Sequence, residues 1–358
     1  MKTDHILIIR FSAMGDVAMV VPVVYELALQ YPDLRITVLS QPFARPFFEF
    51  LAPRVGFMDA DLKNEYQGVV GLNTLYRRLT AKNFTAIADF HDVLRTKWLR
   101  TRFNIDQYHV EHINKHRMQK RRLTAHKHKV FKQLPSSFDN YADVLSRLGY
   151  PIDLGRFHSI FGEGHGNLRL LPPQIGEKKP FQQWIGVAPF ASHTGKTYPL
   201  PLLKEAIEMM IKRHPSCRIF LFGGKERELK ILDEIAAMHK HCINASGILG
   251  GLTNELILMS NLDVMVSMDS ANMHLASLTG TPVVSIWGAT HPYAGFLGWK
   301  QRMEDTVQIT LPCRPCCVFG EKACRRGDYA CLNRIKPSDI ADHVDKIIHN
   351  SQFIIHNS

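Results

Sequence analysis

Apolar residues recur in two patterns along this chain of 358 residues. Short continuous apolar runs bounded by turn residues predict buried strands, and longer stretches with apolar residues three and four apart predict helices. In the first part of the chain we expect strands at residues 5–10, 34–39 and 85–89, and a helix at 17–30. Strands that alternate with helices indicate a parallel sheet, so the chain is predicted to be α/β.

The alternation weakens at residues 162–179, where Gly, Pro and charged residues cluster, and we interpret this stretch as an interdomain linker. Two domains are therefore expected, at residues 1–170 and 180–335, with a terminal segment at 336–358. The second domain should contain strands at 184–188, 218–222, 241–245, 264–267 and 283–286, and helices at 201–213, 226–239, 254–260 and 272–278, followed by a terminal helix at 337–348.

Composition and charge narrow the class of protein. The chain is 45% apolar and 22% charged, as in ordinary globular proteins. It shows no leader-like segment and no run of 18 apolar residues, so we expect a cytoplasmic protein. The net charge of +11 favours anionic partners.

Much of the positive charge lies between residues 91 and 135, which hold twelve Lys or Arg, three acids and six His. Such a segment is either an ordinary solvated surface or a binding site for an anionic partner.

The turn after the first predicted strand carries a candidate catalytic residue. Gly15 permits a tight turn there, and Asp16 should lie at the start of the next helix, where open α/β sheets bind ligands. An aspartate in this position can cap the helix, and it can also act as a general base for a substrate hydroxyl. The two roles are compatible.

Two later turns, each after a predicted strand, suit a phosphate group. One is the run ASHTGK (191–196), and the other is MDSANMHL (268–275), where small residues at a helix start expose backbone N–H groups to an anion. For His274 alone, a buried core position is the alternative to a binding role. No dinucleotide-binding or P-loop glycine pattern occurs, so neither of those sites is predicted.

Five of the seven cysteines lie close together, at positions 313, 316, 317, 324 and 331. Only one Cys-x-x-Cys pair is present, so the paired spacing of common zinc sites is incomplete. The cluster either holds zinc or an iron–sulfur group, or is a packed group of reduced thiols.

Taken in order, these motifs resemble glycosyltransferase family 9, the ADP-heptose:lipopolysaccharide heptosyltransferases and their relatives. The resemblance is carried by IIRFSAMGD (8–16) with Pro22, and by DSANMHLA (269–276) followed by GTP (280–282) and GAT (288–290). The segment from Asp89 to His91 with Arg95, and the cysteine-rich tail, are also similar to segments of that family. Most of the chain is covered.

This resemblance implies a GT-B architecture, in which two Rossmann-like domains face a cleft and the last helix packs back on the N-terminal domain. The implied reaction is inverting and metal-independent, with a nucleotide sugar as donor and no further cofactor. Asp16 matches the general base, and Lys196 matches the lysine that stabilises the departing diphosphate. The positions that match donor-binding residues are Ser192, Glu226, Asp269, Ser270, Ala271 and His274, with Glu228 as a rival for Glu226.

The same resemblance implies ADP-heptose as donor and an anionic lipopolysaccharide core or related glycolipid as acceptor. We expect Arg117, Lys120, Arg121 and Arg122 to hold that acceptor, with peripheral contact at the inner face of the plasma membrane and no nucleic-acid partner.

Two departures from the family leave the sugar open. Ala271 stands where the family has glycine, and Ala191 stands where a hydroxyl is expected. The alternatives are a transferase that uses another nucleotide sugar, and a non-catalytic basic protein that binds glycolipid or nucleic acid.

Overall fold

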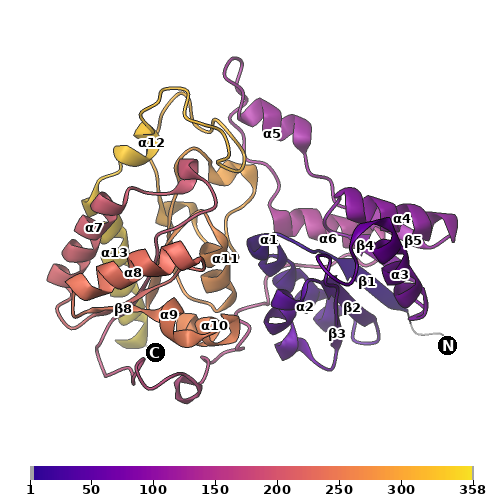
Figure 1. Cartoon of the computed structure of the whole chain (residues 1–358), viewed down its shortest axis with the longest axis horizontal. Helices are drawn as coiled ribbons and strands as arrows, with labels where there is room; N and C mark the ends of the chain where they lie inside the picture. The colour runs from indigo at the N-terminus through magenta and orange to yellow at the C-terminus, as the bar shows by residue number, and fades with distance from the viewer. Residues whose placement is uncertain (1–3, 357–358) are drawn as a thin grey trace. The chain divides into compact units, whose positions relative to one another are not determined.

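The computed structural model describes residues 4–356, with side chains through residue 350. The chain divides into two compact units (Figure 1). The first unit consists of the residues through 115 together with 135–160, and the second consists of 116–134 together with the chain from 161 onward. Each unit contains one parallel sheet with helices packed on it.

The first unit has a five-stranded sheet in the order β3-β2-β1-β4-β5. Side chains alternate across β1, so Leu7 and Ile9 enter the core cluster formed with α3 and α4, while Ile6 and Ile8 are buried on the opposite face. Burial on both faces explains the continuous apolar run of this strand. The strands are β1 (His5–Ile9), β2 (Arg35–Ser40), β3 (Val55–Asp59), β4 (Ala86–Asp89) and β5 (His109–His112).

Helices cover both faces of this sheet, because α3 packs beside α4 and α2 packs beside α6. The expected helix at 17–30 is present as two helices joined at Met19. Pro22 is accommodated in the first turn of the second of these, where its missing N–H removes no helical hydrogen bond. The helices are α1 (Met14–Ala18), α2 (Val20–Gln30), α3 (Gly68–Thr80), α4 (Leu94–Ile105) and α6 (Ser137–Arg147).

The second unit has a six-stranded sheet in the order β11-β10-β9-β6-β7-β8, with every pairing parallel. Its main core cluster joins one face of the sheet to α7, α8 and α13. The strands are β6 (Trp184–Ala188), β7 (Arg218–Leu221), β8 (Cys242–Asn244), β9 (Val264–Met268), β10 (Val283–Ile286) and β11 (Thr306–Val307).

Eight α-helices of the described chain belong to the second unit. They are α5 (Arg117–Leu123), α7 (Leu200–Arg213), α8 (Glu226–Met238), α9 (Ala245–Leu249), α10 (Leu252–Ser260), α11 (Ala271–Leu278), α12 (Ala330–Asn333) and α13 (Pro337–His356). Of the helices in residues 4–356, none is long and apolar enough to cross a lipid bilayer.

Strand order places a ligand-binding position in each sheet. Ligands of open α/β sheets bind beyond the carboxyl ends of the strands, where the strand order reverses. This reversal lies between β1 and β4 in the first unit and between β6 and β9 in the second. The turn that contains Asp16 follows β1. The two loops predicted to suit a phosphate group, residues 191–196 and 268–275, follow β6 and β9.

Two further segments, residues 116–134 and the terminal helix, pack within the second unit. Residues 116–134 belong with the second unit, because Leu123 and Leu134 pack against Tyr293, Ala294 and Phe296. The terminal helix α13 packs within this unit against α7 and the strands β9, β10 and β11. Its apolar face, which includes Ile340 and Val344, fills the core of that unit.

One buried carboxylate ties α2 to the chain after α6. Glu26 has no exposed surface, and its Oε1 accepts hydrogen bonds from the backbone N–H groups of Gly155, Arg156 and Phe157. Its Oε2 accepts a hydrogen bond from the Gln30 side chain.

We predict that Glu26→Ala lowers the free energy of unfolding by about 3 kcal/mol or more, because three backbone donors lose a charged acceptor. Glu26→Gln keeps one acceptor oxygen and should cost less. Glu49→Ala, at an exposed position of the same unit, should change stability by less than about 0.5 kcal/mol. Urea denaturation compares the three variants, and a neutral Glu26→Ala would contradict the prediction.

Candidate active site

Asp16 occupies the third position of α1, close to where the sequence placed it. Its carboxylate accepts a hydrogen bond from the Ala13 N–H at 3.2 Å and pairs with the Arg10 guanidinium at 2.8 Å. Arg10 is buried and also donates to the Phe90 carbonyl at 2.7 Å, whereas the Asp16 side chain stays 29% exposed. The carboxylate is therefore held in a fixed orientation while one side remains open to a substrate.

His91 supports the loop that precedes Asp16. The Phe11 N–H donates to His91 Nδ1 at 3.4 Å, and His91 Nε2 lies 3.4 Å from the Ser12 hydroxyl. Burial, together with the positive charges of Arg10 and Lys115, lowers the pKa of His91 to about 3. The imidazole is therefore neutral at ordinary pH and can accept the hydrogen bond from Phe11.

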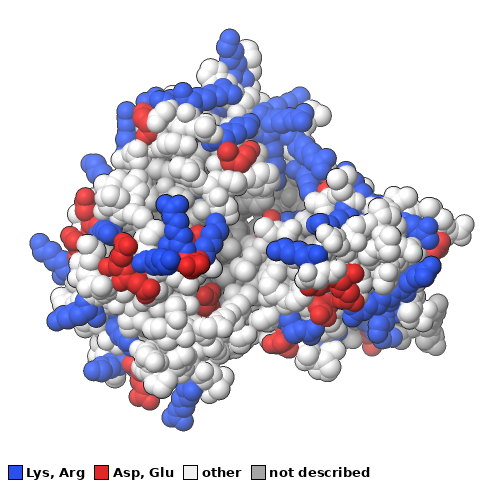
Figure 2. Space-filling model, in the orientation of Figure 1, with Lys and Arg blue, Asp and Glu red and all other residues white. Residues whose placement is uncertain are grey.

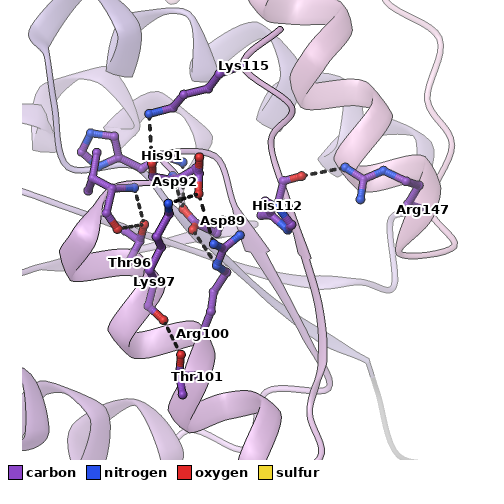
Figure 3. A network of polar contacts seen from close by, with 11 residues as sticks. Asp89, His91, Asp92, Thr96, Lys97, Arg100, Thr101, His112, Lys115 and Arg147 are labelled. Carbon is purple, nitrogen blue, oxygen red and sulfur yellow. Dashed lines mark hydrogen bonds and ion pairs between the residues drawn. The ribbon is translucent and has the colours of Figure 1, made fainter. Parts of the chain in front are cut away.

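Asp89, at the end of β4, organises the loop that follows this strand (Figure 3). It has no exposed surface, and its Oδ1 accepts hydrogen bonds from the backbone N–H groups of His91 at 2.8 Å and Asp92 at 3.0 Å. The Arg100 guanidinium of α4 lies 3.3 Å from the Asp89 carboxylate and 3.1 Å from that of Asp92. The network fixes the start of α4 beside the Asp16 turn.

In the second unit, Lys196 and Asp269 form the central ion pair. Lys196 ends the short 3-10 helix Thr194–Lys196 after β6, and its Nζ lies 3.1 Å from Asp269 Oδ2. The Thr290 hydroxyl, after β10, donates to the same oxygen at 2.7 Å. Both charged side chains are largely buried, at 15% and 6% exposure, so water screens the pair weakly.

The aliphatic stem of Lys196 packs on the cysteine-rich tail at Gly320. A Cβ built at Gly320 would overlap the middle of the Lys196 side chain, and the φ of +82° there also favours glycine. Backbone hydrogen bonds also join the Lys196 loop, the loop after β10 and the tail. The Ala289 N–H donates to the Gly195 carbonyl at 2.8 Å, and the Cys316 N–H donates to the Ala289 carbonyl at 3.0 Å. The tail therefore helps to position Lys196.

The start of α11 lies next to this ion pair. Ser270 is the N-cap residue, Ala271 is the first helical residue, and both are partly exposed. The first-turn N–H groups of a helix attract an anion. His274 is largely buried one turn further along the helix, at 8% exposure. Ser192 is exposed in the Lys196 loop.

The two glutamates proposed for the nucleoside differ in their surroundings. Glu226, the first residue of α8, is 87% exposed and pairs with Lys230 at 3.1 Å. Glu228 accepts hydrogen bonds from the backbone N–H groups of Gly224 and Lys225, so it caps α8. Of the two, only Glu226 presents a largely exposed carboxylate.

Sequence reasoning did not assign roles to Arg10, Thr290 or Glu255. The Glu255 carboxylate accepts from the Ser246 hydroxyl at 2.9 Å, that hydroxyl accepts from the Gly223 N–H at 3.1 Å, and burial raises the pKa of Glu255. This chain of contacts joins α10 to the loop after β7. The sequence position of Glu255, in the first turn of a helix, did not indicate this contact with Ser246.

The four cationic residues expected to hold an acceptor lie on α5. Arg117, Arg121 and Arg122 are exposed, and the Lys120 ammonium lies 4.3 Å from the centre of the Phe296 ring. Figure 2 shows Lys and Arg side chains gathered at the end of the second unit that carries α5 and α12.

The cysteines of the tail are free thiols in this structure. A hydrogen bond with Cys316 lowers the pKa of the neighbouring Cys317. Among the described residues, no three His, Cys, Asp or Glu side chains are grouped so that they could hold a metal ion.

We predict a pH dependence of stability from His91. The unfolded imidazole takes up a proton near pH 6.5 but the folded one only near pH 3, so protonation destabilises the fold as pH falls through that window. His91→Asn keeps an acceptor for the Phe11 N–H but does not titrate. Between pH 7 and pH 5 the variant should lose up to about 2 kcal/mol less stability than the wild type in urea denaturation. Equal losses would contradict the prediction.

Comparisons with known proteins bear on this geometry. The family model described as glycosyltransferase family 9 (heptosyltransferase) matches residues 73–325. The lipopolysaccharide core heptosyltransferase OpsX of Haemophilus influenzae is 21% identical over 80% of this chain and 79% of its own. The family 9 glycosyl transferase of Veillonella parvula superposes with a TM-score of 0.73 at 15% identity, covering 98% of this chain and 99% of that one.

The ADP-heptose lps heptosyltransferase II of E. coli superposes with a TM-score of 0.66 at 16% identity, covering 97% of this chain and 99% of that one. These likenesses confirm the α/β class and the GT-B fold expected from the sequence. Because the family model spans well over half of it, the chain belongs to glycosyltransferase family 9 and is a glycosyltransferase.

Proposed function

We propose that this glycosyltransferase transfers heptose from ADP-heptose to an anionic lipopolysaccharide core or a related glycolipid, with inversion and without a metal. The observation that carries the donor side is the buried pair of Lys196 and Asp269 at the reversal of strand order, beside the start of α11. The names of the heptosyltransferases similar to this chain support the sugar and the acceptor.

The donor's diphosphate requires positive charge where its own negative charge develops during bond cleavage. The Lys196 ammonium and the first-turn N–H groups of α11 supply it, with Ser192 and Ser270 as hydroxyl donors. Asp269 is a carboxylate and would repel a diphosphate, so its role is to hold Lys196 in place together with Thr290. Glu226, Ala271 and His274 complete the donor-binding set.

Asp16 serves as the general base on the acceptor side. An acceptor hydroxyl oxygen forms a bond to the anomeric carbon as the bond from that carbon to the diphosphate breaks, and Asp16 takes the hydroxyl proton. Attack opposite the leaving group inverts the configuration. The Arg10 guanidinium fixes the orientation of the carboxylate for this proton transfer.

The acceptor is held through its negative charges by α5, where Arg117, Lys120, Arg121 and Arg122 lie. Such a glycolipid brings the protein to the inner face of the plasma membrane. Another nucleotide sugar is the second candidate donor, because the Ala271 methyl stands at the first position of α11, where the donor's backbone contacts are proposed.

We predict that ADP-heptose raises the melting temperature more than UDP- or GDP-sugars in a thermal-shift panel. Asp16→Asn should retain this donor-induced shift while transfer to a lipopolysaccharide-core acceptor falls by at least about 100-fold, because the amide cannot accept the proton. A different winning donor would reject heptose transfer, and near-normal turnover of Asp16→Asn would reject the base. No shift with any donor would favour a non-catalytic binding protein.

Gly320→Ala provides a second test, because its methyl group would displace the Lys196 stem. We predict a fall in kcat/KM of about 10-fold or more, since small misplacements of a catalytic group are costly. Gly327→Ala is the matched control, with a φ of +77° in the same tail but no atom within 4 Å of the added methyl group. Equal losses in both variants would show that backbone strain, and not Lys196, is responsible.

A further inference from the structure

A pocket of about 410 Å³ lies within the second unit, beside the cysteine-rich tail at residues 312–331. Its walls come from the segment after α5, from Ala289 after β10, and from the tail. Lys196 and Asp269 are not among the lining residues, so the pocket is separate from the proposed diphosphate site. The proposed function assigns it no role.

The charged side chains that line this pocket are all basic. They are Arg314, Lys322, Arg325 and Arg326, with His126 as a further nitrogen donor, and no Asp or Glu lines the pocket. Lys322, Arg325 and Arg326 are exposed and can turn toward a ligand. Arg326 also pairs with Asp328 outside the lining.

Arg314 contributes a buried positive charge to the wall of the pocket. It is 5% exposed, and its guanidinium donates to the backbone carbonyls of Gly288, Trp287 and Thr290. Within the described residues its hydrogen-bond partners are carbonyl oxygens of the backbone and of one glutamine, and none is a carboxylate. Burial lowers the pKa of Arg314 to about 10.

A second cation adds to the same potential. The Lys129 ammonium donates to the carbonyls of Arg314 at 2.8 Å and Pro315 at 3.0 Å, and burial lowers its pKa. Buried charges are costly unless a counter-charge compensates them. Carbonyl dipoles offset only part of that cost, so the pocket favours an anionic occupant.

Two of the thiols that line the pocket, Cys316 and Cys331, do not supply the missing negative charge. Cys313, Cys316, Cys324 and Cys331 line it. Burial raises the pKa of Cys331 to about 11, and a hydrogen bond with Cys317 together with burial raises the pKa of Cys316. These two thiols are therefore neutral near pH 7.

We propose that this pocket binds a phosphate group, and that the group belongs to the glycolipid acceptor. A phosphate monoester carries between one and two negative charges at pH 7, and its oxygens match the donor fork of arginine. The segment that begins the pocket, residues 124–126, directly follows α5, so the acceptor surface and the pocket are continuous along the chain. Only the source of the phosphate rests on the proposed function.

Alkylation of the pocket thiols by iodoacetamide, followed by peptide mass spectrometry, tests the site. The protein is first saturated with ADP, so that inorganic phosphate cannot act at the diphosphate site. Inorganic phosphate should then slow alkylation of Cys313 and Cys324 by about 3-fold or more relative to chloride at equal ionic strength. The buried Cys217 and Cys242 serve as unreactive references.

Two double variants make the test specific. Lys322→Ala/Arg325→Ala should lose the protection by phosphate, whereas Lys212→Ala/Lys240→Ala, which removes two exposed cations of the same unit away from the pocket lining, should retain it. Three outcomes would each overturn the site. Phosphate could leave the alkylation rate unchanged, the pocket thiols could stay unreactive in both solutions, or the purified protein could contain stoichiometric zinc or iron.

A kinetic measurement identifies the source of the phosphate. Lys322→Ala/Arg325→Ala should raise the KM for a phosphorylated lipopolysaccharide-core acceptor by about 5-fold or more and leave the donor KM unchanged. Protection by inorganic phosphate with an unchanged acceptor KM would overturn the acceptor assignment. Failure of the proposed function is distinguishable, because transfer would then be absent in the wild type as well, while protection of the thiols would persist.

Discussion

The ion pair between Lys196 and Asp269 is the interaction on which the organisation of the second unit's site depends. A lysine this well buried needs a counter-charge, and Asp269 supplies it from the next strand of the sheet while Thr290 fixes the carboxylate. The arrangement draws together the loops after β6, β9 and β10, and the tail closes over the lysine stem at Gly320. In the proposed donor site, an incoming diphosphate would meet an ammonium whose position is already fixed, so bond cleavage would require little reorganisation.

In the first unit, an ion pair between Arg10 and Asp16 likewise fixes a candidate catalytic side chain. Arg10 holds the Asp16 carboxylate, and its own charge helps to keep His91 neutral, which lets His91 accept the Phe11 N–H. Asp89 and Arg100 then fix the neighbouring loop through buried charge and backbone hydrogen bonds. Each candidate catalytic side chain is thus held by an oppositely charged partner at the point where its sheet reverses strand order.

The sequence predicted the elements that carry these residues better than the contacts that hold them. The apolar runs of β1, β6 and β9 follow from burial on both faces, and they placed Asp16, Lys196 and Asp269 just beyond strand ends. By contrast, β5 lies at a sheet edge and has the sequence HVEH, which contains a single apolar residue. The buried residues of α4 are interspersed with four Lys and Arg residues, so neither element shows a clear repeat of apolar positions. The packing of residues 116–134 and of α13 depends on contacts distant in sequence, which local periodicity does not encode.

The tail between residues 312 and 331 contacts both the Lys196 loop and the basic pocket of the second unit. One side of it contacts Lys196 through Gly320, and another side lines the basic pocket through Arg314 and the thiols. Cys316 belongs to both surroundings, since its N–H donates to Ala289, whose own N–H donates to Gly195 in the lysine loop. The pocket wall and the lysine loop therefore share one line of backbone hydrogen bonds through Ala289, which fixes the tail against the loops after β6 and β10.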